Sequence, residues 1–211
     1  MTALVFVLEE DQICIAMDTL VSSASDRLPM SFQRKFLILP TSELIIAGTG
    51  HAGFVNGWLQ YFKDNFFGMR IEELNLAAPN VLRNSLIASG GSDGLTATIY
   101  HFGYSEQECR YIGYAYRSER DFQADKLQDG LAWKPVVPIT ANDDIRFPDF
   151  LIAVMLEQQR RDYLLPTLER VGIGGEIDFV TMSNRSIHVE TVHRFSSYES
   201  EAICIQKRAL S

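Results

Sequence analysis

Three residues near the start of the chain carry side chains that could work together in acyl transfer. Each lies at one end of an apolar run: Thr2 begins the run over residues 2–8, Asp18 ends the run over 13–17, and Lys35 precedes the run over 36–39. If Met1 is removed, Thr2 carries a hydroxyl and a free α-amine on one residue, so that a weak nucleophile has its own base. An acid and a lysine on the next strands would complete such a site.

Each of these residues also has an ordinary explanation. Thr is common at position 2, an aspartate at a strand end often forms a turn, and a lysine often lies at a solvated strand edge. Gly48 and Gly50 would then only let a strand turn into a helix, and His51 would be a surface or helix-capping residue. It is the joint order and spacing of these residues that favours a catalytic site.

The composition narrows the class of protein. The chain has 211 residues, which predicts a single domain over residues 1–211. Its net charge of −8 argues against nucleic acid as a partner, because phosphate binding needs a basic face. No apolar run approaches the ~20 residues of a membrane span, and the first residues lack the features of a signal peptide. We therefore expect a cytoplasmic protein with no membrane partner.

The three cysteines, Cys14, Cys109 and Cys204, are odd in number and widely spaced. This pattern predicts reduced and mostly buried thiols, with no disulfide framework. Nothing in the sequence near them would lower a thiol pKa, so a cysteine nucleophile is poorly supported. We expect neither a metal nor a cofactor.

The apolar patterning predicts four hairpins and three helices. The hairpins pair residues 2–8 with 13–18, 34–39 with 44–49, 95–102 with 109–116, and 176–182 with 187–194. The helices cover residues 51–65, about 72–89 and 148–165, with Pro79 as a possible break in the second. Residues 200–208 are a last strand or a short helix, and residues 117–147 remain unassigned.

The order of these elements indicates the fold class. Strands grouped apart from helices are typical of antiparallel sheets in an α+β fold. The first two hairpins are apolar on both faces, which is typical of strands that are covered on two sides. We therefore expect two stacked antiparallel sheets between helix layers, that is, a four-layer αββα sandwich.

The ordered set of motifs resembles a known family. Thr2 on a strand, the segment Ile15-Ala16-Met17-Asp18 on its partner, Lys35 at the third strand, and Ala47-Gly48-Thr49-Gly50-His51-Ala52 before a helix are similar to a proteasome β-type subunit. The HslV-type bacterial peptidases resemble the chain in the same way. The resemblance covers roughly residues 2–62 and implies an N-terminal nucleophile (Ntn) hydrolase with the αββα fold.

The resemblance implies a role for each residue. Thr2 Oγ would attack the scissile carbonyl, and its α-amine, with an ordinary pKa of about 7.7–8.0, would accept the proton. Lys35 would supply positive charge beside Thr2, Asp18 would orient Lys35, and the N–H of Gly50 would stabilise the oxyanion. The substrate backbone would bind along Ser22 and the loop after Asp18, in a pocket for which Val21 and Thr49 are candidates.

The resemblance also implies an assembly, and it leaves alternatives open. Such peptidases form homo-oligomeric double rings with six or seven subunits per ring, act on unfolded polypeptides or peptides, and can work with an ATP-dependent unfoldase. The usual Asp and Ser before a Gly-Gly pair are absent, since Arg170-Val171-Gly172-Ile173 precedes Gly174-Gly175. A non-catalytic ring subunit or scaffold is therefore the alternative, and an amidase for a small molecule is a more distant one.

Overall fold

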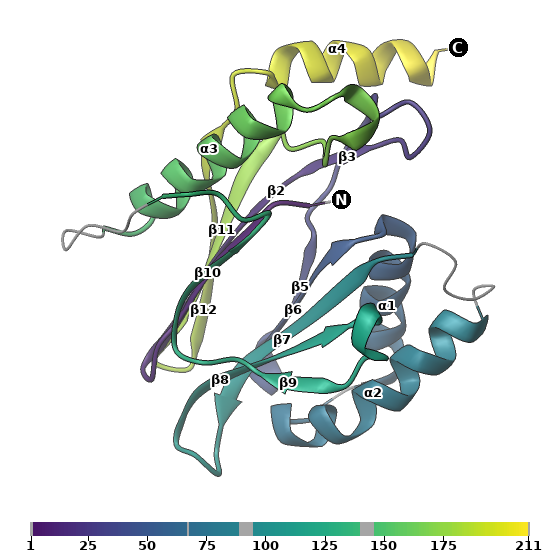
Figure 1. The fold of residues 1–211 in the computed structure, drawn as a ribbon. Coiled ribbons are helices and arrows are strands. Elements are labelled where there is room, and N and C mark those ends of the chain that lie inside the picture. Colours follow the sequence, from purple (N-terminus) through teal and green to yellow (C-terminus); the bar gives the residue numbers. More distant parts are fainter. Residues whose placement is uncertain (1, 67, 89–94, 140–145, 211) are drawn as a thin grey trace.

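The computed structural model describes residues 2–66, 68–88, 95–139 and 146–210, and those residues form an α+β fold. They contain two five-stranded antiparallel sheets, a short two-stranded hairpin and four α-helices. The two large sheets lie face to face, with helices on their outer sides (Figure 1).

The first sheet is built around the N-terminal strands. Its order is β10 (Gly130–Lys134), β1 (Leu4–Leu8), β2 (Gln12–Asp18), β11 (Glu176–Ser183) and β12 (Ser186–Arg194). Every residue of β1 is buried, and so is every residue of β2 after Gln12, because this sheet is covered on both faces.

The second sheet faces the first. Its order is β5 (Phe36–Leu39), β6 (Leu44–Gly50), β7 (Ala97–Ser105), β8 (Arg110–Arg117) and β9 (Ala124–Lys126). A separate hairpin of β3 (Leu20–Ser22) and β4 (Pro29–Phe32) connects the two sheets along the chain.

The helices complete the layers. They are α1 (Ala52–Asn65), α2 (Ile71–Ala88), α3 (Asp149–Leu164) and α4 (Tyr198–Ala209), with short 3₁₀ turns at Pro40–Ser42, Ser118–Arg120 and Thr167–Glu169. Helices α1 and α2 pack on the second sheet, α3 packs on the first, and α4 contacts β4 (Figure 1). In the described part of the chain, no helix is both long and apolar enough to cross a membrane.

Three apolar clusters hold the layers together. Side chains of β1 and β2 meet those of the second sheet in the central cluster, where the Phe6 and Phe102 rings lie edge to face with centroids 5.1 Å apart. A second cluster lies under α1 and α2, and a third lies under α3. The expected order of two sheets between helix layers therefore agrees with the packing.

Most of the predicted elements are present. All four hairpins form, α1 and α3 fall within their predicted ranges, and α2 continues through Pro79 without a break. The first strand of the third hairpin is longer than expected, because β7 continues to Ser105 and the chain turns at 106–109. The prediction of mostly buried thiols was wrong, since Cys14 alone is buried while Cys109 is exposed.

One buried histidine predicts how stability depends on pH. His101 is fully buried on β7, where its Nε2 accepts a hydrogen bond of 3.2 Å from Trp58 Nε1. Burial lowers the pKa of His101 to about 3, so the folded state keeps the ring neutral. The unfolded chain takes up this proton below pH ~6.5. Between pH 7 and pH 5 the free energy of unfolding should therefore fall by about 2 kcal/mol through this residue.

Urea unfolding at the two pH values checks this expectation. His101→Gln keeps an acceptor for Trp58 and removes the titration, so the variant should lack this part of the pH dependence. Comparison of the variant with wild type cancels the contributions of other titrating groups. If the free energy of unfolding depends on pH equally in both proteins, His101 is not the source of this effect.

Candidate active site

The predicted site residues gather at one end of the sandwich. Asp18 and Gly50 are the last residues of β2 and β6. Lys35 directly precedes β5, and Thr2 lies two residues before the start of β1. The N-terminus lies between the two sheets at this end (Figure 1). Antiparallel pairing of β1 with β2 brings the start of one strand beside the end of the other, so Leu4 lies opposite Met17.

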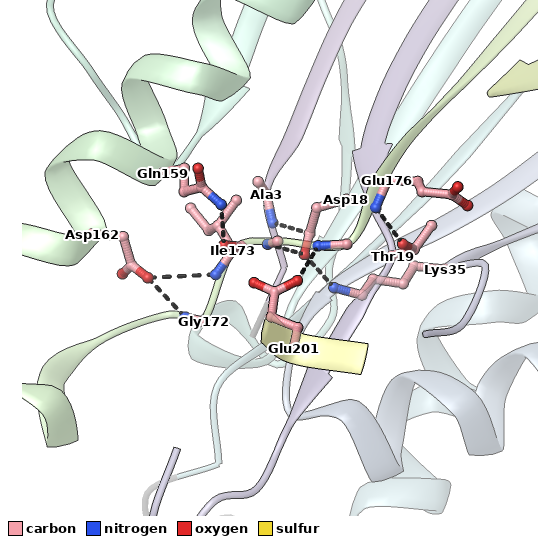
Figure 2. Close-up of polar contacts among 12 residues, drawn as sticks. Ala3, Asp18, Thr19, Lys35, Gln159, Asp162, Gly172, Ile173, Glu176 and Glu201 are labelled. Carbon is pink, nitrogen blue, oxygen red and sulfur yellow. Dashed lines mark hydrogen bonds and ion pairs between the residues drawn. The ribbon is translucent and has the colours of Figure 1, made fainter. Parts of the chain in front are cut away.

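Asp18 connects three separate segments at this end. Its side chain is 0% exposed and accepts three hydrogen bonds (Figure 2). The Lys35 ammonium donates to Oδ2 at 2.8 Å, the Ala3 N–H donates to Oδ1 at 2.8 Å, and the Gly174 N–H donates to Oδ2 at 3.4 Å. The carboxylate thus fixes the lysine, the chain next to Thr2, and the Gly174-Gly175 turn.

Both side chains of the Asp18–Lys35 ion pair are buried. Burial raises the pKa of Asp18 and lowers that of Lys35, while the charge of each partner acts in the opposite direction on the other. Because an isolated charge is costly in such a place, the two groups depend on each other. Lys35 therefore differs from the solvated edge lysine that is the common alternative.

A recess joins the predicted nucleophile to this pair. Its lining includes Thr2, Val21, Ser22, Lys35 and Gly50. Five of the seven predicted site residues thus meet at one place. The cavity volume is ≈ 20 Å³, about the space of a single water molecule, so the recess is narrow in this conformation.

The other two predicted residues lie close by. Asp18 does not line the recess, but it accepts a hydrogen bond from Lys35, which does. Thr49 lines a second recess that also contains Thr2 and Gly50. The structure therefore brings all seven residues to the same end of the molecule, although it does not test their roles.

The glycine at the end of β6 permits a close backbone approach. Gly50 has φ +100°, and a Cβ built there would lie 2.1 Å from the carbonyl oxygen of Thr96. A side chain at this position is excluded, so the backbone borders the recess directly. His51 follows as the N-cap of α1, where its Nδ1 accepts a hydrogen bond from the Phe54 N–H at 3.2 Å. The capping interpretation of His51 is thereby confirmed.

Two carboxylates that sequence reasoning missed support the Gly174-Gly175 turn (Figure 2). Asp162 of α3 accepts hydrogen bonds from the N–H groups of Val171 at 2.6 Å and Gly172 at 2.9 Å. Glu201 of α4, 5% exposed, accepts one from the Gly175 N–H at 2.8 Å.

Gly174 leaves room for the Glu201 carboxylate in its present position. A Cβ at Gly174 would lie 2.2 Å from Glu201 Oε1. Burial raises the pKa of Glu201, and the nearby Asp18 adds to the increase. The only signal in the sequence was an acidic residue on a predicted terminal element, and a charged residue on a helix usually faces solvent.

Metal ligands do not gather in the part of the chain that the structure describes. There, no three His, Cys, Asp or Glu residues are grouped so that they could hold an ion.

Comparison with known proteins shows which solved structures have a similar fold. No protein-family model matches the chain, and no curated protein matches its sequence. Among solved structures, an Anbu (Gly-1) mutant from Hyphomicrobium sp. strain MC1 is similar, with a TM-score of 0.69 and 13% identity over 99% of this chain and 94% of that chain. Anbu (ancestral beta-subunit) from Yersinia bercovieri has a TM-score of 0.58 and 11% identity over the same shares.

These findings correct the family assignment made from sequence. The expected proteasome β-type or HslV-like identity was wrong, because the two similar solved structures named above are Anbu proteins. The motifs behind that prediction sit at strand ends and before a helix, positions that a shared fold dictates. Such motifs cannot distinguish one family within the fold from another. At 13% identity the likeness to Anbu concerns the fold alone.

The buried ion pair gives a test in stability. Asp18→Asn leaves the Lys35 ammonium buried without a counter-charge and should lower the free energy of unfolding by about 3–5 kcal/mol. The double variant Asp18→Asn/Lys35→Met removes both charges and should recover most of that loss.

Chemical denaturation of the wild type, both single variants and the double variant checks the coupling. Additive losses in the double variant would show that the two residues do not depend on each other.

Proposed function

We propose that the chain is an N-terminal threonine peptidase of a proteasome-like kind, with the fold of Ntn hydrolases. The observation that carries the proposal is the recess that Thr2 shares with Lys35 and Gly50, with Lys35 held by the buried Asp18. The likeness of the whole chain in fold to two Anbu proteins, of which the one from Yersinia bercovieri is described as an ancestral beta-subunit, supports it.

The proposed chemistry divides into two acyl transfers. After removal of Met1, Thr2 Oγ attacks the peptide carbonyl while the α-amine of Thr2 takes the hydroxyl proton. The amine then gives that proton to the departing peptide nitrogen, and water hydrolyses the resulting ester. The Lys35 ammonium favours the charge that develops on Oγ, and the Gly50 N–H stabilises the oxyanion.

The substrate in this proposal is an unfolded polypeptide or peptide. Val21 and Ser22 line the recess beside Thr2, and Thr49 lines the neighbouring one, so these residues would contact the chain on either side of the scissile bond. Met1 lies outside the described residues, and its removal is part of the proposal.

A second candidate is a subunit that keeps the fold without catalysis. The absence of an Asp and a Ser directly before Gly174-Gly175 favours it. Against it, the carboxylates of Asp162 and Glu201 hold this turn from two helices, so the turn does not need acidic residues of its own. An amidase for a small molecule would use the same nucleophile and differ in substrate alone.

Substitution at Thr2 tests the proposed chemistry. Thr2→Ala should lose all peptidase activity, whereas Thr2→Ser should keep part of it, because serine retains the hydroxyl and the amine. A peptide epoxyketone, which reacts with both groups, should add its mass to wild type and to Thr2→Ser but not to Thr2→Ala. Intact mass spectrometry also reports whether Met1 is gone. Activity in Thr2→Ala would exclude Thr2 as the nucleophile.

The proposed assembly is a closed homo-oligomer, a double ring with six or seven subunits per ring, which an ATP-dependent unfoldase could serve. Exposed apolar side chains on α1 and α3, Tyr61 at 39% and Leu164 at 73%, suit subunit contacts. Light scattering at micromolar concentration should give a mass of many subunits; a monomer would contradict the compartment.

A further inference from the structure

A second recess meets the first at the nucleophile. It shares Thr2 and Gly50 with the narrow recess described above and has a cavity volume of ≈ 290 Å³. The narrow recess, at ≈ 20 Å³, admits about one water molecule, so a substrate side chain fits in the second recess in this conformation. The residue next to the scissile bond on this side is therefore the one whose side chain the protein can select.

Lys134 is one of the residues that line this recess. It is the last residue of β10 and lies opposite Leu4 of β1, two residues after Thr2. Its Nζ donates a hydrogen bond of 3.2 Å to the neutral hydroxyl of Thr98. Within the described ranges, no carboxylate lies within 4.0 Å of this ammonium, whereas Lys35 and Lys126 each have an acidic partner.

Among the residues that the structure describes, this charge has no close counter-ion. Burial lowers the pKa of Lys134; the more distant Glu119 acts against this change, and Arg117 adds to it. Arg117 itself is paired with Asp125. The ammonium is thus available to a ligand that brings its own negative charge.

The remaining walls define the shape of that ligand. Pro135, Val136 and Val171 supply apolar surface, and the lining also includes the three threonines Thr2, Thr49 and Thr96. A side chain with an aliphatic stem and an anionic tip complements this lining, because the stem contacts the valines while the tip meets the ammonium.

We propose that Lys134 selects peptide substrates with an acidic side chain, glutamate or aspartate, next to the bond that Thr2 cleaves. This inference rests on the proposed function, since it concerns the same nucleophile. It adds a specificity-determining residue from β10, which is separate from the segments that contain Thr2, Asp18 and Lys35.

Pairs of peptides that differ by glutamate or glutamine beside the scissile bond test the proposal. Each position, before and after the bond, is varied in turn, so that size is matched and charge alone differs. At one of the two positions, wild type should cleave the glutamate peptide with a kcat/KM at least tenfold above that of the glutamine peptide. A ratio near one at both positions would overturn the proposal.

Two variants assign the preference to Lys134. Lys134→Met should bring the ratio close to one, and Lys134→Glu should reverse it and favour a lysine peptide. Lys126→Met, at a surface lysine paired with Glu108, should leave the ratio unchanged. An unchanged ratio in folded Lys134→Met would overturn the assignment.

The two proposals fail in different ways. If wild type cleaves no peptide and gains no mass from an epoxyketone, the peptidase itself is refuted, and the substrate preference with it. If wild type is labelled and cleaves peptides without regard to charge, the preference alone is refuted.

Discussion

The carboxylate of Asp18 is the interaction on which the candidate site depends. It is 0% exposed, and its hydrogen bonds come from Lys35, from the Ala3 N–H and from the Gly174 N–H. A buried carboxylate needs such donors, because water is absent to solvate it. The same requirement positions the lysine, the start of β1 and the turn before β11. The geometry of the site thus follows from satisfying a single buried charge.

Support for this arrangement comes from two helices, α3 on the first sheet and α4 against β4. Asp162 on α3 and Glu201 on α4 accept hydrogen bonds from the backbone between Val171 and Gly175, and Gly174 in turn donates to Asp18. The turn is therefore held from two directions before it reaches the ion pair. Loss of either helix contact would therefore affect Lys35 through Gly174 and Asp18. Neither carboxylate lines the narrow recess beside Thr2 itself.

Much of the fold could be predicted because strands that are neighbours in the sequence pair with each other. The pairs β1–β2 and β11–β12 both appear in the sequence as two apolar runs separated by a turn. Asp18 and Lys35 were found for the same reason, since each lies at the end of such a run. β10 was missed because it alternates over only five residues at a sheet edge. Glu201 and Lys134 could not be found, because their contacts join residues far apart in sequence. Asp162 could not be found because its partners are backbone N–H groups of a segment without regular secondary structure, which leaves no pattern in the sequence.

A crystal structure of the processed chain after reaction with a peptide epoxyketone would test the central claim most directly. The account predicts continuous density from the inhibitor to both Oγ and the α-nitrogen of Thr2, with Lys35 beside it and still paired with Asp18. It also predicts that the inhibitor's oxygen faces the backbone at Gly50. An inhibitor bonded to another residue, or a Thr2 side chain on the opposite face of the sheet from Lys35, would contradict the account.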